Sequence, residues 1–183
     1  DVLNLPIRKK HDKPVLLIAG SIDRIESTAL IRMADEAFSN SDSIELWFKG
    51  HPSMALEGLF EEIDIKYDKS GYVICHNDIS HCLEGATAVL VPSSTVAIEA
   101  LSYGCEVIIP IFADSMNLNP LIGFEGYYHL VTSPEELNSV MESIANGCIL
   151  HNLDEYREFV RNYWLIDPLM PEWEDLLSRD NRK

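Results

Sequence analysis

A chain of 183 residues with 46% hydrophobic side chains suits one packed domain, or one domain with a helical appendage. Its formal net charge of −16 argues against a surface for nucleic acid or an anionic membrane, because both would repel it. No apolar run approaches the roughly 20 residues that span a bilayer, and no signal peptide opens the sequence. The sequence begins at Asp1 rather than Met, which allows for a piece of a longer protein.

The cysteines show no paired spacing and lie in apolar or helical contexts: Cys75, Cys82, Cys105 and Cys148. This pattern predicts reduced thiols in a cytoplasmic protein. If the protein associates with the inner face of a membrane, we expect that to occur through parts of it outside this chain. A zinc site that combines two of these cysteines with His76 and His81 fits no known ligand spacing, since a five-residue step misaligns two histidines on a helix. We therefore expect no metal.

The first predicted strand covers residues 14–20 and follows a basic linker or edge segment at residues 1–13. Gly20 and Ser21 form the turn at its carboxyl end. Residues 25–38 then predict an amphipathic helix, because apolar side chains from Ile25 onward recur three, four or seven apart. A glycine and a serine between strand and helix suit the close approach of a ligand phosphate, and ordinary turn geometry is the alternative explanation.

A second strand is predicted over residues 44–50, and His51 and Pro52 stand directly at its end. Ligands of open α/β sheets bind at the carboxyl ends of strands, so His51 is placed where a nucleotide would bind. A neutral imidazole can donate to or accept from such a ligand. A solvent-exposed loop histidine is the alternative. A short acidic helix over residues 54–63 follows.

A third strand is predicted over residues 72–75, before a turn at His76 and Asn77. Asn77 or Asp78 would cap a short helix over residues 79–85.

A strand–helix–strand unit over residues 88–110 is the centre of the prediction. Its first strand, residues 88–91, ends at proline, its helix ends at Gly104, and its second strand starts at residue 107. Three hydroxyl residues precede the helix: Ser93, Ser94 and Thr95. Free N–H groups and the helix dipole favour the binding of phosphate at such a place. The alternative is that the hydroxyls only cap the helix.

The remaining pattern predicts a loop, a last strand and three helices: residues 113–128, 128–131, 132–145, 153–163 and 171–177. The alternation of strands and helices predicts an α/β fold, a Rossmann-like doubly wound parallel sheet of about five or six strands with helices on both faces. We expect this domain to cover residues 14–150 and a C-terminal helical tail to cover residues 151–183.

Several short motifs together resemble the C-terminal, donor-binding half of GT-B glycosyltransferases. The segment 99–104, with the strand that follows it, is similar to the donor-binding segment of that fold. The run 49–52 resembles the His-Pro motif, and Ser93-Ser94 the serine motif, of bacterial sialyltransferases, polysialyltransferases and related capsule enzymes that use CMP-activated sugars. Residues 162–173 are similar to the end of surface-carbohydrate biosynthesis proteins, and the whole resemblance covers about residues 14–178.

This resemblance implies a donor-nucleotide site with these members: Gly20 and Ser21 in the first donor-side loop, His51 and Pro52 on the nucleotide, His76 and Asn77 beside the base, Ser93, Ser94 and Thr95 on the phosphate, and Glu99 on the ribose. Two positions depart from the pattern. Val91 stands where retaining members often have a glutamate, which counts against the common retaining class. Glu106 stands where proline is usual, which leaves the identity of the donor open.

The resemblance also implies a nucleotide-sugar substrate, CMP-linked rather than UDP- or CDP-linked, no cofactor, and a role in bacterial capsule or lipopolysaccharide biosynthesis. The catalytic base would come from an N-terminal acceptor-binding domain of the same protein, which does not fit within this chain. We therefore expect the chain alone to bind donor weakly and not to catalyse. The alternatives are half of a sugar-nucleotide epimerase or polyol-phosphate transferase, and a non-catalytic interaction module with a decayed nucleotide pocket.

Overall fold

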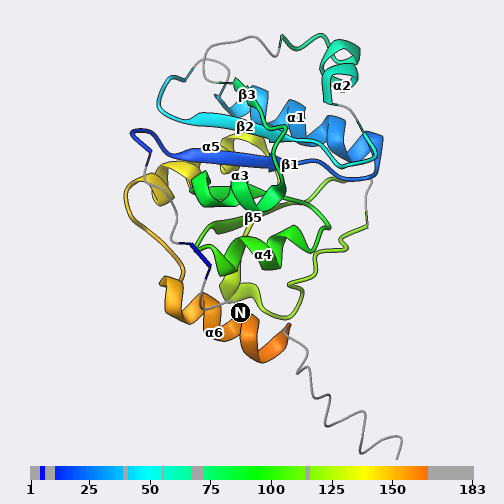
Figure 1. Ribbon diagram of the computed structural model, residues 1–183. Helices are drawn as coiled ribbons and strands as arrows, with labels where there is room; N and C mark the ends of the chain where they lie inside the picture. Colours follow the sequence, from blue (N-terminus) through cyan, green and yellow to red (C-terminus); the bar gives the residue numbers. More distant parts are fainter. Residues whose placement is uncertain are drawn as a thin grey trace, which may run out of the picture.

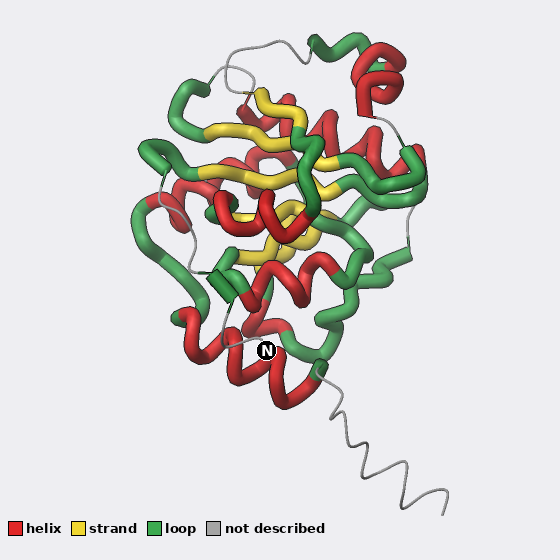
Figure 2. The backbone as a smooth tube through the Cα atoms, in the orientation of Figure 1, coloured by secondary structure: helices red, strands yellow, loops and turns green. Residues whose placement is uncertain are grey.

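The computed structural model describes residues 5–6, 11–38, 41–54, 56–66, 72–113 and 116–164. Within these ranges the strands form one six-stranded sheet in the order β3-β2-β1-β4-β5-β6, and neighbouring strands always run parallel. Helices cover both faces of the sheet (Figure 1; Figure 2). The predicted α/β architecture, a Rossmann-like doubly wound parallel sheet, is therefore confirmed.

The strands are β1 (Val15–Ala19), β2 (Glu45–Lys49), β3 (Tyr72–Ile74), β4 (Ala88–Leu90), β5 (Glu106–Pro110) and β6 (His129–Val131). β1 and β5 are buried along their whole length, because each lies between two other strands and two layers of helices. Each strand lies close to its predicted position, since a short apolar run closed by a turn residue is typical of a buried parallel strand.

The helices are α1 (Arg24–Phe38), α2 (Leu56–Glu62), α3 (Ile79–Gly85), α4 (Val96–Ser102), α5 (Pro134–Ala145) and α6 (Leu153–Tyr163), and a 3₁₀ turn, η2 (Glu125–Tyr127), precedes β6. The helix predicted over residues 171–177 and most of the predicted segment 1–13 lie outside the described residues. In the described part of the chain, no helix combines the length and the apolar character needed to cross a membrane.

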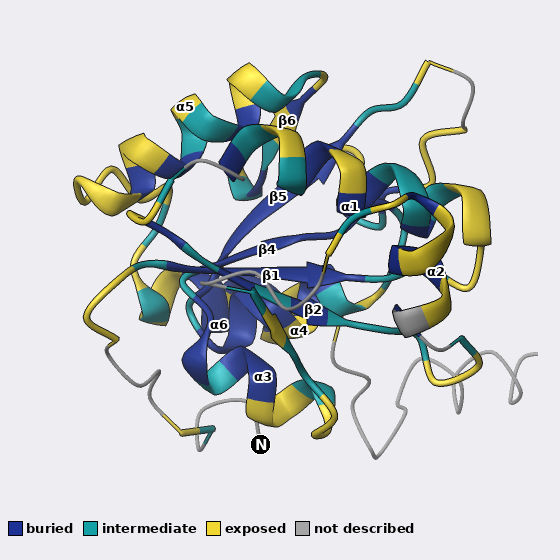
Figure 3. Cartoon of the chain, turned by 90° about the horizontal axis from the view of Figure 1, so that it is seen from above, coloured by how far each residue is buried: buried dark blue, intermediate teal, exposed yellow. Residues whose placement is uncertain are grey.

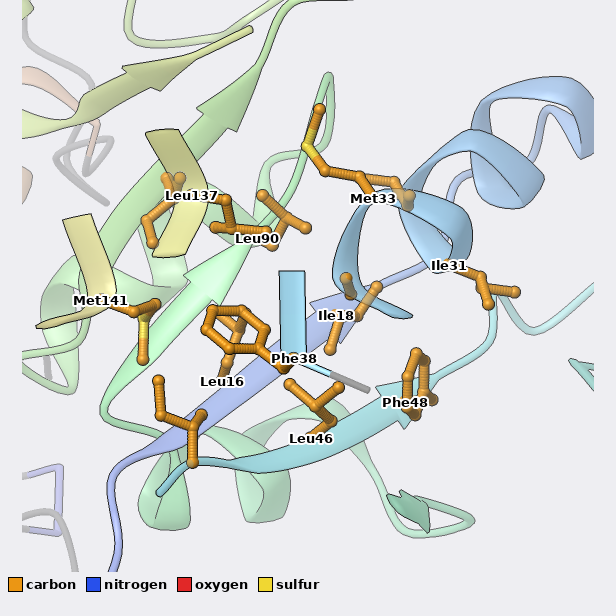
Figure 4. Close-up of a cluster of buried hydrophobic side chains, with 14 of the residues drawn as sticks. Leu16, Ile18, Ile31, Met33, Phe38, Leu46, Phe48, Leu90, Leu137 and Met141 are labelled. Atoms are coloured by element: carbon orange, nitrogen blue, oxygen red, sulfur yellow. The ribbon is translucent and has the colours of Figure 1, made fainter. Parts of the chain in front are cut away.

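Two apolar layers sandwich the sheet, because successive side chains of a strand point to opposite faces. On one face α1, α2 and α5 cover Leu16 and Ile18 of β1; on the other, α3, α4 and α6 cover Leu17 and Ala19. Figure 3 shows the two groups of helices on either side of the buried strands. Figure 4 shows the first layer, in which Leu137 and Met141 of α5 face the sheet.

The first turn of α1 differs from the prediction. Ile25 was expected on the buried face, but 82% of its surface is exposed. Ser27 is buried instead, and its Oγ donates to the carbonyl of Ser21 at 2.9 Å. This turn lies at the carboxyl edge of the sheet, where the strands end and offer no apolar surface, so the periodic pattern alone misplaced it.

Candidate functional site

The carboxyl ends of all six strands lie along one edge of the sheet, because the strands run in one direction. The chain moves outward from β1 to β2 and β3, then returns to place β4 on the other side of β1. The loops after β1 and β4 therefore lead to helices on opposite faces and leave a crevice between them, which is the usual ligand position in open α/β sheets.

Two glycines hold the turns at this edge close together. The N–H of Gly20 donates to the carbonyl of Lys49 at 2.8 Å, and a Cβ on Gly20 would lie 3.3 Å from that oxygen. A Cβ on Gly50 would lie only 2.8 Å from the carbonyl oxygen of Met54, so only glycine fits the turn that presents His51. The His51 ring is fixed in turn by Ser53, whose N–H donates to Nδ1 at 3.2 Å.

A hollow of about 580 Å³, here called the switch-point hollow, lies in the crevice. Ser21 and Glu26 line it from the β1–α1 side, Ser93 lines it from the loop after β4, and Phe112 lines it from the loop after β5. The Oγ of Ser93 donates to Oε2 of Glu26 at 3.2 Å, and the Oγ of Ser21 accepts from the N–H of Asp23 at 3.1 Å. The structure thus brings together the two serines that the sequence placed at separate strand ends.

The switch-point hollow is acidic inside and apolar at its rim. Asp23 and Glu26 line it, and none of the described residues that line it is basic. Its rim carries four exposed apolar side chains: Ile22 (69% exposed), Ile25 (82%), Met116 (78%) and Leu118 (61%). An anionic ligand would therefore need hydrogen-bond donors here to offset the charge of the carboxylates.

A second hollow of about 260 Å³, the histidine hollow, lies beside the first on the β2–β3 side. His51, Pro52 and His76 line it together, as adjacent parallel strands require. Lys49, the last residue of β2, also lines it and brings a positive charge to this edge. Asn77 is exposed and lines neither hollow, and Asp78 rather than Asn77 precedes α3, with no side-chain cap.

Thr95 and Glu99 lie elsewhere. They line a third hollow, of about 400 Å³, between α4 and α6, together with Tyr103 and other residues. At the start of α4 the Oγ of Ser94 accepts from the N–H of Val96 at 3.3 Å, while Thr95 is already helical and makes no side-chain cap. The hydroxyl cluster is therefore divided: Ser93 faces the switch-point hollow, Ser94 caps, and Thr95 turns toward α6.

Sequence reasoning missed Glu26 and Phe112 as lining residues. Acidic residues are common in the first turn of a helix, so nothing in the sequence distinguished Glu26 from an ordinary surface residue. Phe112 lies two residues beyond β5, at a strand end like the others, and the strand-end argument would have found it. Lys49 belongs to the His-Pro motif at residues 49–52 and is the one lysine or arginine within it.

Glu106, which departs from the family pattern, lies at the amino end of β5 and thus at the opposite edge of the sheet. Its carboxylate is 2% exposed and accepts from the hydroxyl of Tyr156 at 2.7 Å and from the N–H of Leu150 at 3.3 Å. Nε2 of His129 lies 2.9 Å from its other oxygen. Burial and the neighbouring carboxylate raise the pKa of Tyr156. Glu106 therefore joins α6 to the sheet and does not face the candidate site.

The described residues contain no group of three or more histidine, cysteine or acidic side chains that could hold a metal ion. No protein-family profile and no curated protein sequence matches the chain.

Solved structures match the chain in three dimensions. HepE of Anabaena, in complex with UDP and glucose, has a TM-score of 0.69 and 11% identity over 91% of this chain. CalG4, the calicheamicin glycosyltransferase, has a TM-score of 0.63 and 16% identity over 94%. WaaG, a glycosyltransferase involved in lipopolysaccharide biosynthesis, has a TM-score of 0.56 and 20% identity over 88%.

The chain has the fold of one half of a GT-B glycosyltransferase. It spans 48%, 44% and 45% of the HepE, CalG4 and WaaG chains, respectively. The fold predicted from the strand-and-helix pattern and the fold implied by the motifs are therefore the same.

Proposed function

We propose that this chain is the nucleotide-sugar binding half of a glycosyltransferase. The observation that carries the proposal is the meeting of Ser21 and Ser93 in one hollow at the point where the strand order reverses. HepE, which shares the fold, has been solved with UDP-glucose, and this supports a nucleotide-sugar as the ligand class.

In this proposal the phosphates bind at the two loops of the switch point, and the base lies toward the histidine hollow. Gly20 permits the close approach, Ser93 donates a hydroxyl hydrogen bond, and His51, Pro52 and His76 border the nucleoside. Lys49 supplies the positive charge that the switch-point hollow lacks. Thr95 and Glu99 line the separate hollow between α4 and α6, so the donor contacts that the motifs imply for them, with Glu99 on the ribose, are not part of the proposed site.

The proposed reaction needs a second lobe. A glycosyltransferase accelerates the departure of the nucleotide by stabilising the charge that grows on its phosphate, and hydroxyl and N–H donors at the switch point suit that role. The base that activates the acceptor hydroxyl would belong to an N-terminal acceptor-binding domain of the same protein. We therefore propose that the isolated chain binds donor weakly and transfers no sugar.

The proposal also concerns which nucleotide carries the sugar and which polysaccharide receives it. The resemblance of the His-Pro and Ser-Ser motifs favours a CMP-linked sugar for a bacterial surface polysaccharide, whereas the HepE complexes contain UDP. A comparison of nucleotides on the same protein sample distinguishes these donors.

The test is a titration with CMP, CDP and UDP, followed by NMR of the backbone amides. The variants are Ser93→Ala and His51→Ala, and the matched controls are Ser139→Ala on the exposed face of α5 and His81→Ala on α3. We expect shifts at Gly20, Ser21, His51 and Ser93, one preferred nucleotide, and weaker binding only in the two site variants.

The proposal would be overturned if no nucleotide changed the amide chemical shifts, either in this chain or in the full-length protein that contains it. The second candidate function is then the interaction module with a decayed pocket. One observation favours it specifically: two carboxylates and no described basic side chain line the hollow where phosphates would bind. In that case the controls and the site variants behave alike.

A further inference from the structure

Arg24, the first residue of α1, stands at the border of the switch-point hollow but does not line it. Its neighbours Asp23, Ile25 and Glu26 all line that hollow. The guanidinium is held by α2 instead: Nε donates to Oε2 of Glu62 at 2.8 Å, and Nη2 donates to the same oxygen. We propose that Arg24 is the phosphate-binding cation of the donor site and that Glu62 holds it until a ligand phosphate takes the place of this carboxylate.

The switch-point hollow has hydroxyl donors for a phosphate but no cation among the described residues that line it. Asp23 and Glu26 give it two carboxylates, which repel a phosphate placed beside them. Lys49 lines the neighbouring histidine hollow and brings its charge there. A guanidinium beside the serines of the switch-point hollow offsets part of the repulsion, and its planar fork can donate two parallel hydrogen bonds to phosphate oxygens.

The position of Arg24 on the helix allows its side chain to turn from α2 toward the hollow. Every Cα–Cβ bond of a helix is tilted toward the N-terminus, so the side chain of the first residue projects past the end of α1, where no preceding turn blocks it. The side chains of Arg24 and Glu62 are 54% and 51% exposed, so no buried contact has to be broken. A change of rotamer is therefore sufficient, and the backbone can stay in place.

The present ion pair is a weak competitor for the guanidinium. Water screens the attraction between exposed side chains, so such a pair contributes little to stability. The helix dipole also disfavours a cation in the first turn, whereas α1 has no basic residue in its last turn, where the dipole would favour one. Arg24 therefore has its charge where an anion is needed. A phosphate offers it two acceptor oxygens, while Glu62 offers it only Oε2.

This inference rests on the proposed function, because it assigns a cation to the same donor site. It adds a consequence for α2, which packs beside α1 in the same apolar layer (Figure 3). When phosphate takes Arg24, Glu62 loses its partner and the polar link between the two helices opens. Occupation of the hollow is then detectable at Glu62, outside the site itself.

The first test measures the Kd of CMP and UDP by calorimetry, in this chain and in the full-length protein that contains it. We expect Arg24→Gln to weaken binding about tenfold, because a charge-assisted hydrogen bond to phosphate is lost. Arg32→Gln, at an exposed position farther along α1, removes the same charge and should change Kd little. Cytidine and uridine, which lack phosphate, should bind equally to both variants.

The second test measures the coupling between Glu62 and Arg24. Glu62→Gln should tighten CMP or UDP binding about threefold, because the guanidinium no longer has to leave a carboxylate. Glu61→Gln, the exposed neighbour on α2, is the matched control and should have a much smaller effect. In the Arg24→Gln background the gain from Glu62→Gln should vanish. In the native protein, added nucleotide should shift the NMR signal of the Arg24 Nε–H group.

Two outcomes overturn the inference and leave the proposed function in place. In one, nucleotides bind but Arg24→Gln and Arg32→Gln have the same Kd; in the other, the gain from Glu62→Gln persists without Arg24. If no nucleotide binds to this chain or to the full-length protein, the inference and the proposed function both fail. Urea unfolding checks that the variants fold, and their midpoints should stay close to the native value because all four positions are exposed.

Discussion

At the scale of single residues, the carboxylate of Glu26 would oppose the binding of an anion in the switch-point hollow. Its carboxylate accepts the hydrogen of the Ser93 hydroxyl, the donor that a phosphate would use. We predict that Glu26→Gln tightens CMP or UDP binding by on the order of 1 kcal/mol, about fivefold in Kd, because a repelling charge is removed while the shape is kept. Calorimetry or NMR titration measures the change.

The control for this prediction is Glu36→Gln, an exposed position farther along α1. It changes the net charge by the same amount at a distance from the hollow, so its effect on Kd should be small. Equal effects of the two variants would show that total charge, and not the contact with Ser93, governs binding.

Tyr156, which is buried, and Tyr72, which is half-buried, make the stability of the protein depend on pH. Burial and nearby carboxylates raise the pKa of Tyr156 and Tyr72 above the ordinary value of 10.0. The folded protein therefore keeps protons that the unfolded chain loses above pH 10. This contribution to stability is complete below pH 10 and is lost as the pH rises, by up to about 1.4 kcal/mol per pH unit for each tyrosine.

Urea unfolding between pH 8 and pH 11 measures this loss. In Tyr156→Phe the fall in the free energy of unfolding above pH 10 should be shallower, although the protein is less stable at pH 8 because Glu106 loses one of its hydrogen-bond partners. Tyr163→Phe, at a 62% exposed position on the same helix, is the control. An unchanged slope in Tyr156→Phe would contradict the assignment.

At the scale of elements, the residues that precede the helices differ in how much they contribute to the stability of the helix start. Asn152 caps α6: its side chain accepts from the N–H groups of Asp154 and Glu155 at 3.0 Å, and Glu155 reaches back to the N–H of Asn152 at 2.8 Å. Thr95 precedes α4 without any side-chain cap. We expect Asn152→Ala to destabilise the protein by about 1 kcal/mol.

Thr95→Ala is the comparison for this prediction and should change the free energy of unfolding by less than the error of a urea curve. Both variants remove a polar side chain next to a helix that packs in the same apolar layer. A loss at Thr95 as large as that at Asn152 would mean that the hydroxyl contributes to the fold in some other way.

At the scale of the whole molecule, the net charge of −16 opposes the binding of a nucleotide phosphate. We predict that raising the ionic strength from low to physiological values tightens CMP or UDP binding, because salt screens the repulsion. Titrations at several salt concentrations measure this trend. The uncharged nucleosides cytidine and uridine are the controls, and their affinity should stay nearly constant; weaker nucleotide binding with added salt would contradict the prediction.

The sheet could be predicted from the sequence because each parallel strand is a short apolar run with a turn residue after it. Strand-end reasoning also placed His51 and His76 correctly at one edge, where both line the same hollow. The contact between Ser93 and Glu26 joins distant parts of the chain, and no local pattern encodes it. For the same reason the position of Glu99 beside α6 could not be read from the spacing of α4.

The position of β1 has a consequence for how the chain is made. β1 pairs with β2 on one side and with β4 on the other, yet β4 leaves the ribosome only after β2, α2, β3 and α3. Until then one edge of a wholly apolar strand has no partner, and such an edge can pair with another nascent chain. In the finished sheet the two outer strands, β3 and β6, are only three residues long, so the hazard ends when β4 docks.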